Sequence, residues 1–145
     1  MSRVEIQASY QAAREEVFAA FSRPAAIEQW LGPSDEFRTT VHEFEFRPGG
    51  KYRIEFLSPE GETSVLTGSY SAIEAPERIV FSWRWIQNTE FPDSETRVTV
   101  QLSEKPEGDG TLLRLTHEKL QAGVMRDRHI WGWQGAFERL DRHLG

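Results

Sequence analysis

The sequence contains no cysteine and no long apolar run. The first absence excludes disulfide bonds, thiolate metal sites and cysteine nucleophiles, and it leaves no need for an oxidising compartment. The second leaves no stretch near the roughly 18 apolar residues of a membrane-spanning helix. The N-terminus also lacks the basic and then apolar pattern of a signal peptide. We therefore expect a cytoplasmic protein that does not enter a membrane.

The sequence also has fewer positively charged residues than negatively charged ones. Lys and Arg number 17 against 23 Asp and Glu, which gives a net charge of -6, and no block of basic residues interrupts this balance. Such a surface repels the phosphate backbone of nucleic acids and anionic lipid. A chain of 145 residues is long enough for one well-filled core. We therefore predict a single domain over residues 1–145 and no nucleic-acid partner.

Several motifs of catalysis and metal binding are missing. His42, His129 and His143 are scattered at no metal-ligand spacing. No Gly-x-Ser-x-Gly motif or phosphate-binding glycine loop is present, since Gly49-Gly50 falls in a predicted hairpin and does not open a helix. The sequence therefore predicts no metal site and no cofactor, and it assigns no catalytic residue.

The N-terminal part of the chain predicts a strand followed by two short helices. Apolar residues from Val4 to Ala8 alternate with polar ones, which is the period of a half-buried strand. Ser9 is the expected N-cap of a helix over residues 11–21. Pro24 then opens a second helix, which Gly32-Pro33 ends because proline cannot continue a helix.

Most of the remaining chain alternates with a period of two, and short turns join the alternating segments. Strands connected in this way, with no helix between them, are typical of an antiparallel meander. We therefore predict a sheet of seven antiparallel strands, one at the N-terminus and six beyond the short helices. The six further strands are expected at about residues 41–47, 52–56, 63–73, 79–85, 97–102 and 111–117.

A long helix is predicted at the C-terminus, from about Met125 to Leu144. Large apolar residues recur there at three- and four-residue steps, and such a stripe needs a broad apolar surface, which the sheet provides. Gly132 and Gly135 are expected to let this helix approach a neighbouring backbone closely. The predicted fold class is α+β, with a curved antiparallel sheet wrapped on this helix. The stripe consists of Ile130, Trp133, Phe137, Leu140 and Leu144.

A set of local motifs extends along nearly the whole chain. The motifs are Trp30-Leu31-Gly32-Pro33, Phe46-Arg47-Pro48-Gly49-Gly50-Lys51-Tyr52, Gly68-Ser69-Tyr70, Pro76 to Trp83, Gly110 to Leu113, His117-Glu118 and Gly132-Trp133. Their order and spacing resemble the START-like or SRPBCC superfamily, whose fold is called helix-grip or birch-pollen-allergen-like. Within it, the chain resembles the AHSA-type branch, named after the heat-shock-protein-90 ATPase activator homologues.

The resemblance implies the helix-grip fold more directly than any one activity. Members that resemble this chain include co-chaperones, ligand carriers and polyketide cyclases. The eukaryotic co-chaperones carry an additional N-terminal domain that engages the chaperone, and we expect no room for it in 145 residues. A chaperone partner is therefore the less expected role.

The chain is rich in aromatic residues, which make up 12% of it and include five Trp. Many of them share the parity that places side chains on the concave face of the sheet, towards the terminal helix. Pockets are lined mostly by apolar and aromatic groups, so this surplus predicts one. The predicted ligand-binding residues are Trp30, Phe46, Tyr52, Phe56, Trp83, Trp85, His117, Trp133 and Phe137.

Each of these residues also has a simpler interpretation. The aromatic side chains, Trp133 and Phe137 above all, would serve equally well as core packing, and Trp30 would fasten its helix to the sheet. His117 shares parity with Leu115, so we expect it on the inner face. There it can exchange a proton with a ligand or act as a hydrogen-bonded structural histidine. The sequence leaves both interpretations open.

The leading functional hypothesis is a protein that binds a small apolar or aromatic ligand. The ligand would occupy a cavity between the sheet and the terminal helix, with the short helices and the loop over residues 87–93 at its entrance. The first rival is a cyclase- or dehydratase-like enzyme acting in the same cavity, in which His117 and Tyr52 or Arg53 transfer protons. Only one inward histidine is predicted, and this favours binding over catalysis.

The second rival is a co-chaperone-like activator of heat-shock-protein-90 ATPase. Such a role would use an apolar patch on the outer face of the sheet, and the charged residues predicted there disfavour it. The sequence leaves open whether the protein forms a homodimer. The predicted outer-face residues are Glu43, Arg53, Glu55, Arg84 and Arg97.

Overall fold

Residues 2–88, 91 and 93–145 are described by a computed structural model. The elements follow in the order β1 (Ser2–Tyr10), α1 (Arg14–Ser22), α2 (Pro24–Trp30), β2 (Arg38–Phe44), β3 (Lys51–Leu57), β4 (Thr63–Glu74), β5 (Arg78–Gln87), β6 (Glu95–Glu104), β7 (Thr111–Leu120) and α3 (Val124–Leu144). The strands form one seven-stranded sheet in the order β1-β7-β6-β5-β4-β3-β2, and every neighbouring pair is antiparallel. This topology confirms the predicted α+β fold.

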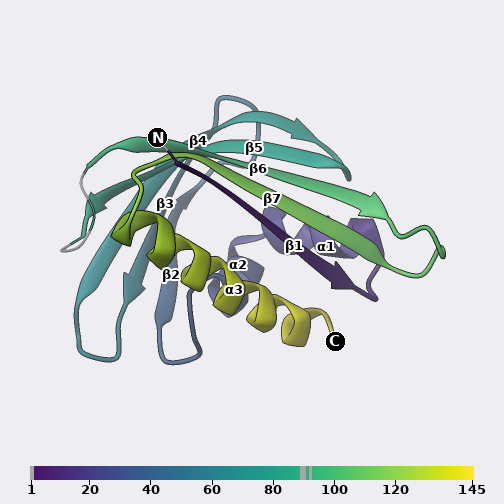
Figure 1. Ribbon diagram of the computed structural model, residues 1–145, viewed down its shortest axis with the longest axis horizontal. Coiled ribbons are helices and arrows are strands. Elements are labelled where there is room, and N and C mark those ends of the chain that lie inside the picture. Colours follow the sequence, from purple (N-terminus) through teal and green to yellow (C-terminus); the bar gives the residue numbers. More distant parts are fainter. Residues whose placement is uncertain (1, 89–90, 92) are drawn as a thin grey trace.

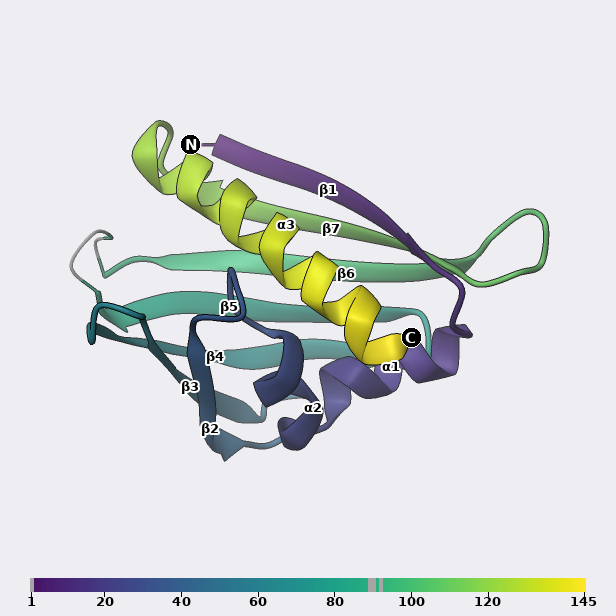
Figure 2. The same cartoon turned by 90° about the horizontal axis from the view of Figure 1, so that it is seen from below.

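The sheet is curved, and α3 lies across its concave face (Figure 1). The helix runs diagonally over the strands, and its C-terminal end lies beside α1 and α2 (Figure 2). This arrangement confirms the helix-grip architecture. Within the described residues, no helix combines the length and the apolar character that a membrane span requires.

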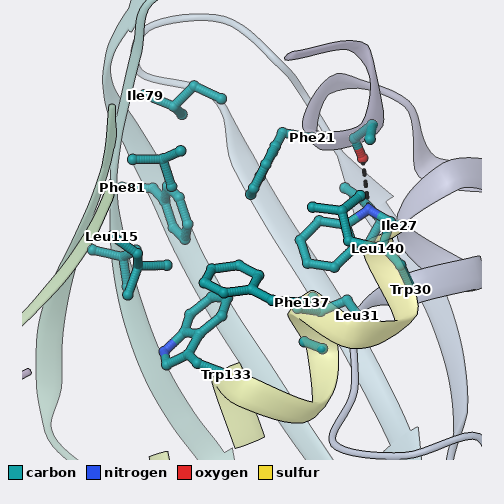
Figure 3. Packing of buried hydrophobic residues seen from close by; sticks show 14 of the residues in the cluster. Phe21, Ile27, Trp30, Leu31, Ile79, Phe81, Leu115, Trp133, Phe137 and Leu140 are labelled. Carbon is teal, nitrogen blue, oxygen red and sulfur yellow. Dashed lines mark hydrogen bonds between the residues drawn. The ribbon is translucent and has the colours of Figure 1, made fainter. Parts of the chain in front are cut away.

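The core lies between α3 and the sheet, as the apolar stripe of the terminal helix predicts. Trp133 and Phe137 of α3 point towards Phe81 of β5, and Trp30 of α2 fills the far end (Figure 3). Trp30 is only 1% exposed, and its Nε1–H donates to the carbonyl oxygen of Ala20 at 2.9 Å. That bond satisfies the polar atom of the indole, so the ring can be buried at little cost.

The first helix starts later than predicted. β1 continues through Ser9, which pairs with Leu112, to Tyr10, whose hydroxyl donates to the carbonyl oxygen of Phe137 at 3.3 Å. Ser9 is therefore a strand residue, and α1 begins without a side-chain N-cap. The predicted N-cap was wrong because pairing with β7 and the burial of Tyr10 extend the strand.

β2 is displaced relative to the strand predicted over residues 41–47. It spans Arg38–Phe44, because the chain folds into a compact turn directly afterwards. In that turn the Gly50 N–H donates to the carbonyl oxygen of Arg47 at 2.8 Å. A Cβ at Gly50 would lie 2.0 Å from the carbonyl oxygen of Glu45, so glycine permits this tight path.

β7 extends beyond its predicted end at His117, to Leu120. Leu120 is fully buried against Val4 of β1 and Met125 of α3. This small apolar cluster fastens the start of α3 to the edge of the sheet. His117 therefore lies inside a strand, under the first turns of the helix.

The two central glycines of α3 differ in what surrounds them. A Cβ at Gly135 would lie 1.9 Å from the carbonyl oxygen of Pro33, which confirms the expected close approach to a neighbouring backbone. A Cβ at Gly132 would meet nothing within 4 Å. The expectation for Gly132 was wrong, because this glycine borders open space and makes no close backbone contact.

Replacing each glycine by alanine should change stability in opposite directions. Gly135→Ala forces a methyl group against Pro33 and should lower the free energy of unfolding by about 1–3 kcal/mol, the usual cost of overpacking. Gly132→Ala introduces a better helix former into open space and should raise it by about 0.5–1 kcal/mol. Urea unfolding followed by circular dichroism measures both. Equal effects of the two substitutions would contradict this difference in packing.

Candidate functional site

A pocket of about 240 Å³ lies between α3 and the sheet, near the turn that joins β3 and β4. The N-terminal half of α3 forms one wall, and β5 with the β3–β4 turn forms the other. The loop between α2 and β2 closes a third side. Gly132 lines the pocket, so the open space beside this glycine is part of it. The aromatic lining residues are Phe37, Phe56, Trp83, Trp85, Phe91, Trp131 and Trp133.

The lining side chains at the mouth of the pocket are exposed, whereas those at its inner end are buried. Glu60, Glu62 and Arg128 are exposed lining residues and form the mouth. Trp131 is 45% exposed beside them, and the guanidinium of Arg128 lies 4.7 Å from the centre of its ring. The mouth is thus charged, whereas the inner end is mainly aromatic. The buried residues of the inner end are Leu31, Phe56, Trp83, His129, Trp133 and Ala136.

Two tryptophans of β5 share one hydrogen-bond acceptor at the inner end. The Nε1–H groups of Trp83 and Trp85 donate to Nε2 of His129 at 3.2 and 3.1 Å. The Nδ1–H of His129 donates to the carbonyl oxygen of Met125 at 2.7 Å, one turn earlier in α3. Because Nε2 accepts two bonds, it carries no proton, and the imidazole is neutral. β5 is thereby tied to the N-terminal half of α3.

His117 accepts a bond from the third indole. The Nε1–H of Trp133 donates to Nδ1 of His117 at 3.1 Å. The Thr96 hydroxyl donates to the carbonyl oxygen of Trp83 at 2.8 Å, so it accepts the Nε2–H of His117 at 2.7 Å. This imidazole is also neutral, in the opposite tautomer from His129.

The two imidazole rings lie 5.1 Å apart, centre to centre. Together with the three indoles they form the indole–imidazole cluster, which we define as Trp83, Trp85, His117, His129 and Trp133. Burial lowers the pKa of His117 well below its usual value, and charge on His129 would lower it further. Burial also lowers the pKa of His129, against an opposing effect of its bond to a backbone carbonyl. The cluster therefore keeps the inner end free of charge.

The structure brings Phe56, Trp83, Trp85 and Trp133 of the predicted ligand-binding residues to this pocket. Of the predicted entrance, residues 88 and 91 line the pocket, whereas neither short helix contributes a lining residue and the loop after α2 lines it instead. Residues 89, 90 and 92 of that entrance lie outside the described residues. A pocket thus lies between the sheet and the terminal helix, and its role as a ligand cavity stays a prediction.

Two other predicted residues, Trp30 and Tyr52, line a second cavity of about 30 Å³ deeper in the core. Leu31, Trp83 and Trp133 line both cavities, and the ring centres of the two indoles lie 4.9 Å apart. These three side chains therefore separate the deep cavity from the pocket.

The remaining predicted residues line neither space. Phe46 packs against Phe18 and Tyr70, Phe137 packs against Trp133, and His117 lies behind the wall as the acceptor for Trp133. Their contribution to ligand binding stays a prediction.

Sequence reasoning missed His129, which lines the pocket and is only 5% exposed. The prediction of a single inward histidine was therefore wrong. A signal was available, because His129 precedes Trp133 by four residues and so lies on the same face of the helix. Only apolar residues were counted as members of the inward stripe of the terminal helix, so His129 was left out.

The residues of the predicted proton-transfer set do not meet in the pocket. Tyr52 is buried, and its hydroxyl donates to the carbonyl oxygen of Ser82 at 2.6 Å. Burial raises the pKa of Tyr52 well above its usual value. Arg53 is exposed, as the alternation along β3 requires. Among the described side chains, no group of three or more carboxylates and imidazoles could hold a metal ion.

Solved structures with this fold cover nearly the whole chain. A protein of Chromobacterium violaceum is 26% identical with a TM-score of 0.88, over 98% of this chain and 96% of that one. A protein of Rhodobacter sphaeroides is 28% identical with a TM-score of 0.82, over 99% and 91%. The AHSA1 protein of Silicibacter pomeroyi is 23% identical with a TM-score of 0.85, over 99% and 97%, and shares the fold.

A comparison with curated proteins found no match. The family model of Activator of Hsp90 ATPase homolog 1-like proteins, by contrast, matches residues 11–145. That range begins just after β1 and includes every residue that lines the pocket. The chain therefore belongs to the family of Activator of Hsp90 ATPase homolog 1-like proteins.

Proposed function

We propose that the protein binds a small apolar or aromatic ligand in the pocket between α3 and the sheet. The observation that carries this proposal is the aromatic inner end, where buried rings border space that no side chain fills. Water in such a space finds few polar partners, so an apolar ligand that displaces it gains free energy.

The dimensions of the pocket favour a compact ligand. Its volume of about 240 Å³ lies just below the range of about 300–1,000 Å³ that is typical of sites for drug-sized molecules. Phe56 and Trp85 pack against each other at 5.6 Å between ring centres, and Phe91 lies 5.8 Å from Trp85. These rings touch and form one continuous aromatic wall, against which a ring or a short branched hydrocarbon can pack.

Catalysis in the same pocket is the weaker alternative. A general acid or base must present a proton or a lone pair to the bound molecule. Both nitrogens of His129 are engaged, one with a backbone carbonyl and the other with two indoles. His117 lies behind Trp133 with both nitrogens engaged as well. These histidines support the wall and present no reactive group to a ligand.

The family description also names activation of the Hsp90 ATPase. A chaperone contact would use accessible apolar surface, and the outer faces of β5 and β6 carry ion pairs instead. Arg84 pairs with Asp93, and Arg97 pairs with Glu118. This charged surface supports a role for the pocket over a role for the outer face of the sheet.

Filling the pocket should abolish ligand binding without unfolding the protein. Titration with naphthalene should shift the indole N–H resonances of Trp83 and Trp85 in NMR spectra, and the shifts should saturate. Gly132→Leu places a side chain in the open space beside Gly132 and should weaken binding by at least about tenfold, because the ligand and the new side chain compete for one volume.

Gln134→Leu is the matched control, since it adds the same side chain at an exposed position of the same helix. This variant should bind naphthalene as the unchanged protein does. If the unchanged protein gave no saturable shift, or if Gly132→Leu bound equally well, the proposed function would be wrong.

The indole–imidazole cluster should make the fold sensitive to mild acid. In the unfolded chain both histidines take up protons below a pKa of about 6.5, whereas burial lowers both pKa values in the folded state. Their contribution is therefore fully present above about pH 6.5, and the free energy of unfolding falls as the pH drops below it. The expected slope is about 1.4 kcal/mol per pH unit for each histidine that stays neutral.

Urea unfolding between about pH 7 and pH 5 measures this slope, because most carboxylates titrate at lower pH. His129→Gln keeps an acceptor near the indoles but removes one titrating group, so its slope should be shallower. A stability that does not change over this interval would show that the histidines are not held neutral.

A further inference from the structure

We infer that the ligand of this pocket is an apolar amine, with a compact hydrocarbon or aromatic body at the inner end and a protonated or quaternary nitrogen at the mouth. The inference rests on the ligand-binding function proposed above. It follows from the distribution of hydrogen-bond donors, charges and aromatic rings along the wall.

The indoles of the inner end have no hydrogen-bond donor left for a ligand. The N–H groups of Trp83 and Trp85 go to His129, and that of Trp133 goes to His117. The N–H of His129 goes to a backbone carbonyl. A carboxylate or ketone placed there would lose its bonds to water and gain none from these side chains.

The neutral polar side chains further out are bonded to each other or to the backbone of the surrounding turns. Asn88 Nδ2 donates to Ser64 Oγ at 3.0 Å, and Asn88 Oδ1 accepts the N–H of Phe91 at 3.0 Å. Ser58 Oγ accepts the N–H of Glu62 at 3.0 Å. These bonds hold the turns that form the wall.

The described charged residues at the mouth carry a net negative charge. Among the residues that the structure describes, two carboxylates, Glu60 and Glu62, and one guanidinium, Arg128, line the mouth, and together they carry a charge of -1 in a protein of net charge -6. These groups are exposed, so they act on the approach and orientation of a charged ligand. A cation is therefore favoured over an anion at the mouth.

The aromatic rings also favour a cation. The guanidinium of Arg128 already lies 4.7 Å from the centre of the Trp131 ring, so an indole at the mouth accepts positive charge on its face. The bonds of Trp83 and Trp85 to His129 direct the positive N–H edges of these rings at the imidazole and away from a ligand. These two rings present their π faces to the hydrocarbon body of the ligand at the inner end, and the π face at the mouth, beside the nitrogen, is that of Trp131.

Three compounds that share a benzyl group test the inference. Benzyltrimethylammonium is a cation, neopentylbenzene is its uncharged isostere, and phenylacetate is an anion. Isothermal titration calorimetry should show the cation binding at least about tenfold more tightly than the other two. The difference should shrink with added salt, since the mouth is exposed. Gly132→Leu should weaken the binding of every compound that uses this pocket.

Substitutions of the carboxylates at the mouth distinguish the effect of local charge on affinity from the effect of the protein's net charge. Glu60→Gln and Glu62→Gln should each lower the affinity for benzyltrimethylammonium by about two- to fivefold and leave neopentylbenzene unchanged. Glu107→Gln makes the same change in net charge at an exposed position between β6 and β7, at the opposite end of the sheet from the start of α3 (Figure 2). This control should bind the cation as the unchanged protein does.

Equal affinity for the cation and its uncharged isostere would overturn the amine inference and leave ligand binding intact. Tighter binding of phenylacetate would overturn it as well and would assign the selectivity of the mouth to Arg128. An equal loss in Glu107→Gln would show that only the net charge of the protein matters, which also contradicts a local site.

Binding of naphthalene without binding of any benzyl compound would again reject the amine inference alone. Failure of all four compounds to bind would reject the proposed function itself.

Discussion

The pocket depends on one interaction, the acceptance of three indole N–H groups by two neutral imidazoles. A buried N–H without an acceptor costs about 1–3 kcal/mol, so each of three tryptophans at one place needs an acceptor for its N–H. His129 supplies a shared acceptor to Trp83 and Trp85, and His117 supplies one to Trp133. The opposite tautomers of the two rings let each imidazole place its own N–H on a different partner. No donor within the cluster is left without an acceptor.

The space beside the cluster follows from how α3 is held at two points along its length. Near its start, the bonds that His129 accepts from Trp83 and Trp85 and the burial of Met125 fix the helix against the sheet. Further along, Gly135 brings the helix into contact with the backbone of Pro33. Gly132 lies between these two points and contributes no side chain, so the gap between helix and sheet stays open there. A larger residue at this position would fill the gap without disturbing either contact.

Much of this architecture could be predicted from the sequence because it depends on local periodicity. The period of two in the middle of the chain and the three- and four-residue steps at its end determine the antiparallel sheet and the helix that covers it. Strand parity also places Trp83 and Trp85 correctly on the inner face. The errors at Ser9 and at the end of β2 arise where pairing with a distant strand or a tight turn overrides the local pattern.

The remaining features of the site could not be predicted because they depend on contacts between distant segments. Nothing in the sequence distinguishes Gly132, beside open space, from Gly135, against a backbone carbonyl. Similarly, the pattern that identifies Trp133 as inward does not show that His117 lies behind it as an acceptor. Side-chain direction follows from periodicity, whereas the presence of a void follows from the packing of several elements together.

The separation of the two cavities limits what the pocket can accept. Leu31 and the paired rings of Trp83 and Trp133 lie between the pocket of about 240 Å³ and the deeper cavity of about 30 Å³, and a longer ligand that passed between the two rings would have to part them to reach the second space. The two rings are bonded to different histidines on different elements, His129 on α3 and His117 on β7. Parting them would break at least one of these bonds and leave a buried donor without an acceptor, which costs about 1–3 kcal/mol before any new contact forms. The same bonds that shape the aromatic wall therefore favour short ligands over long ones.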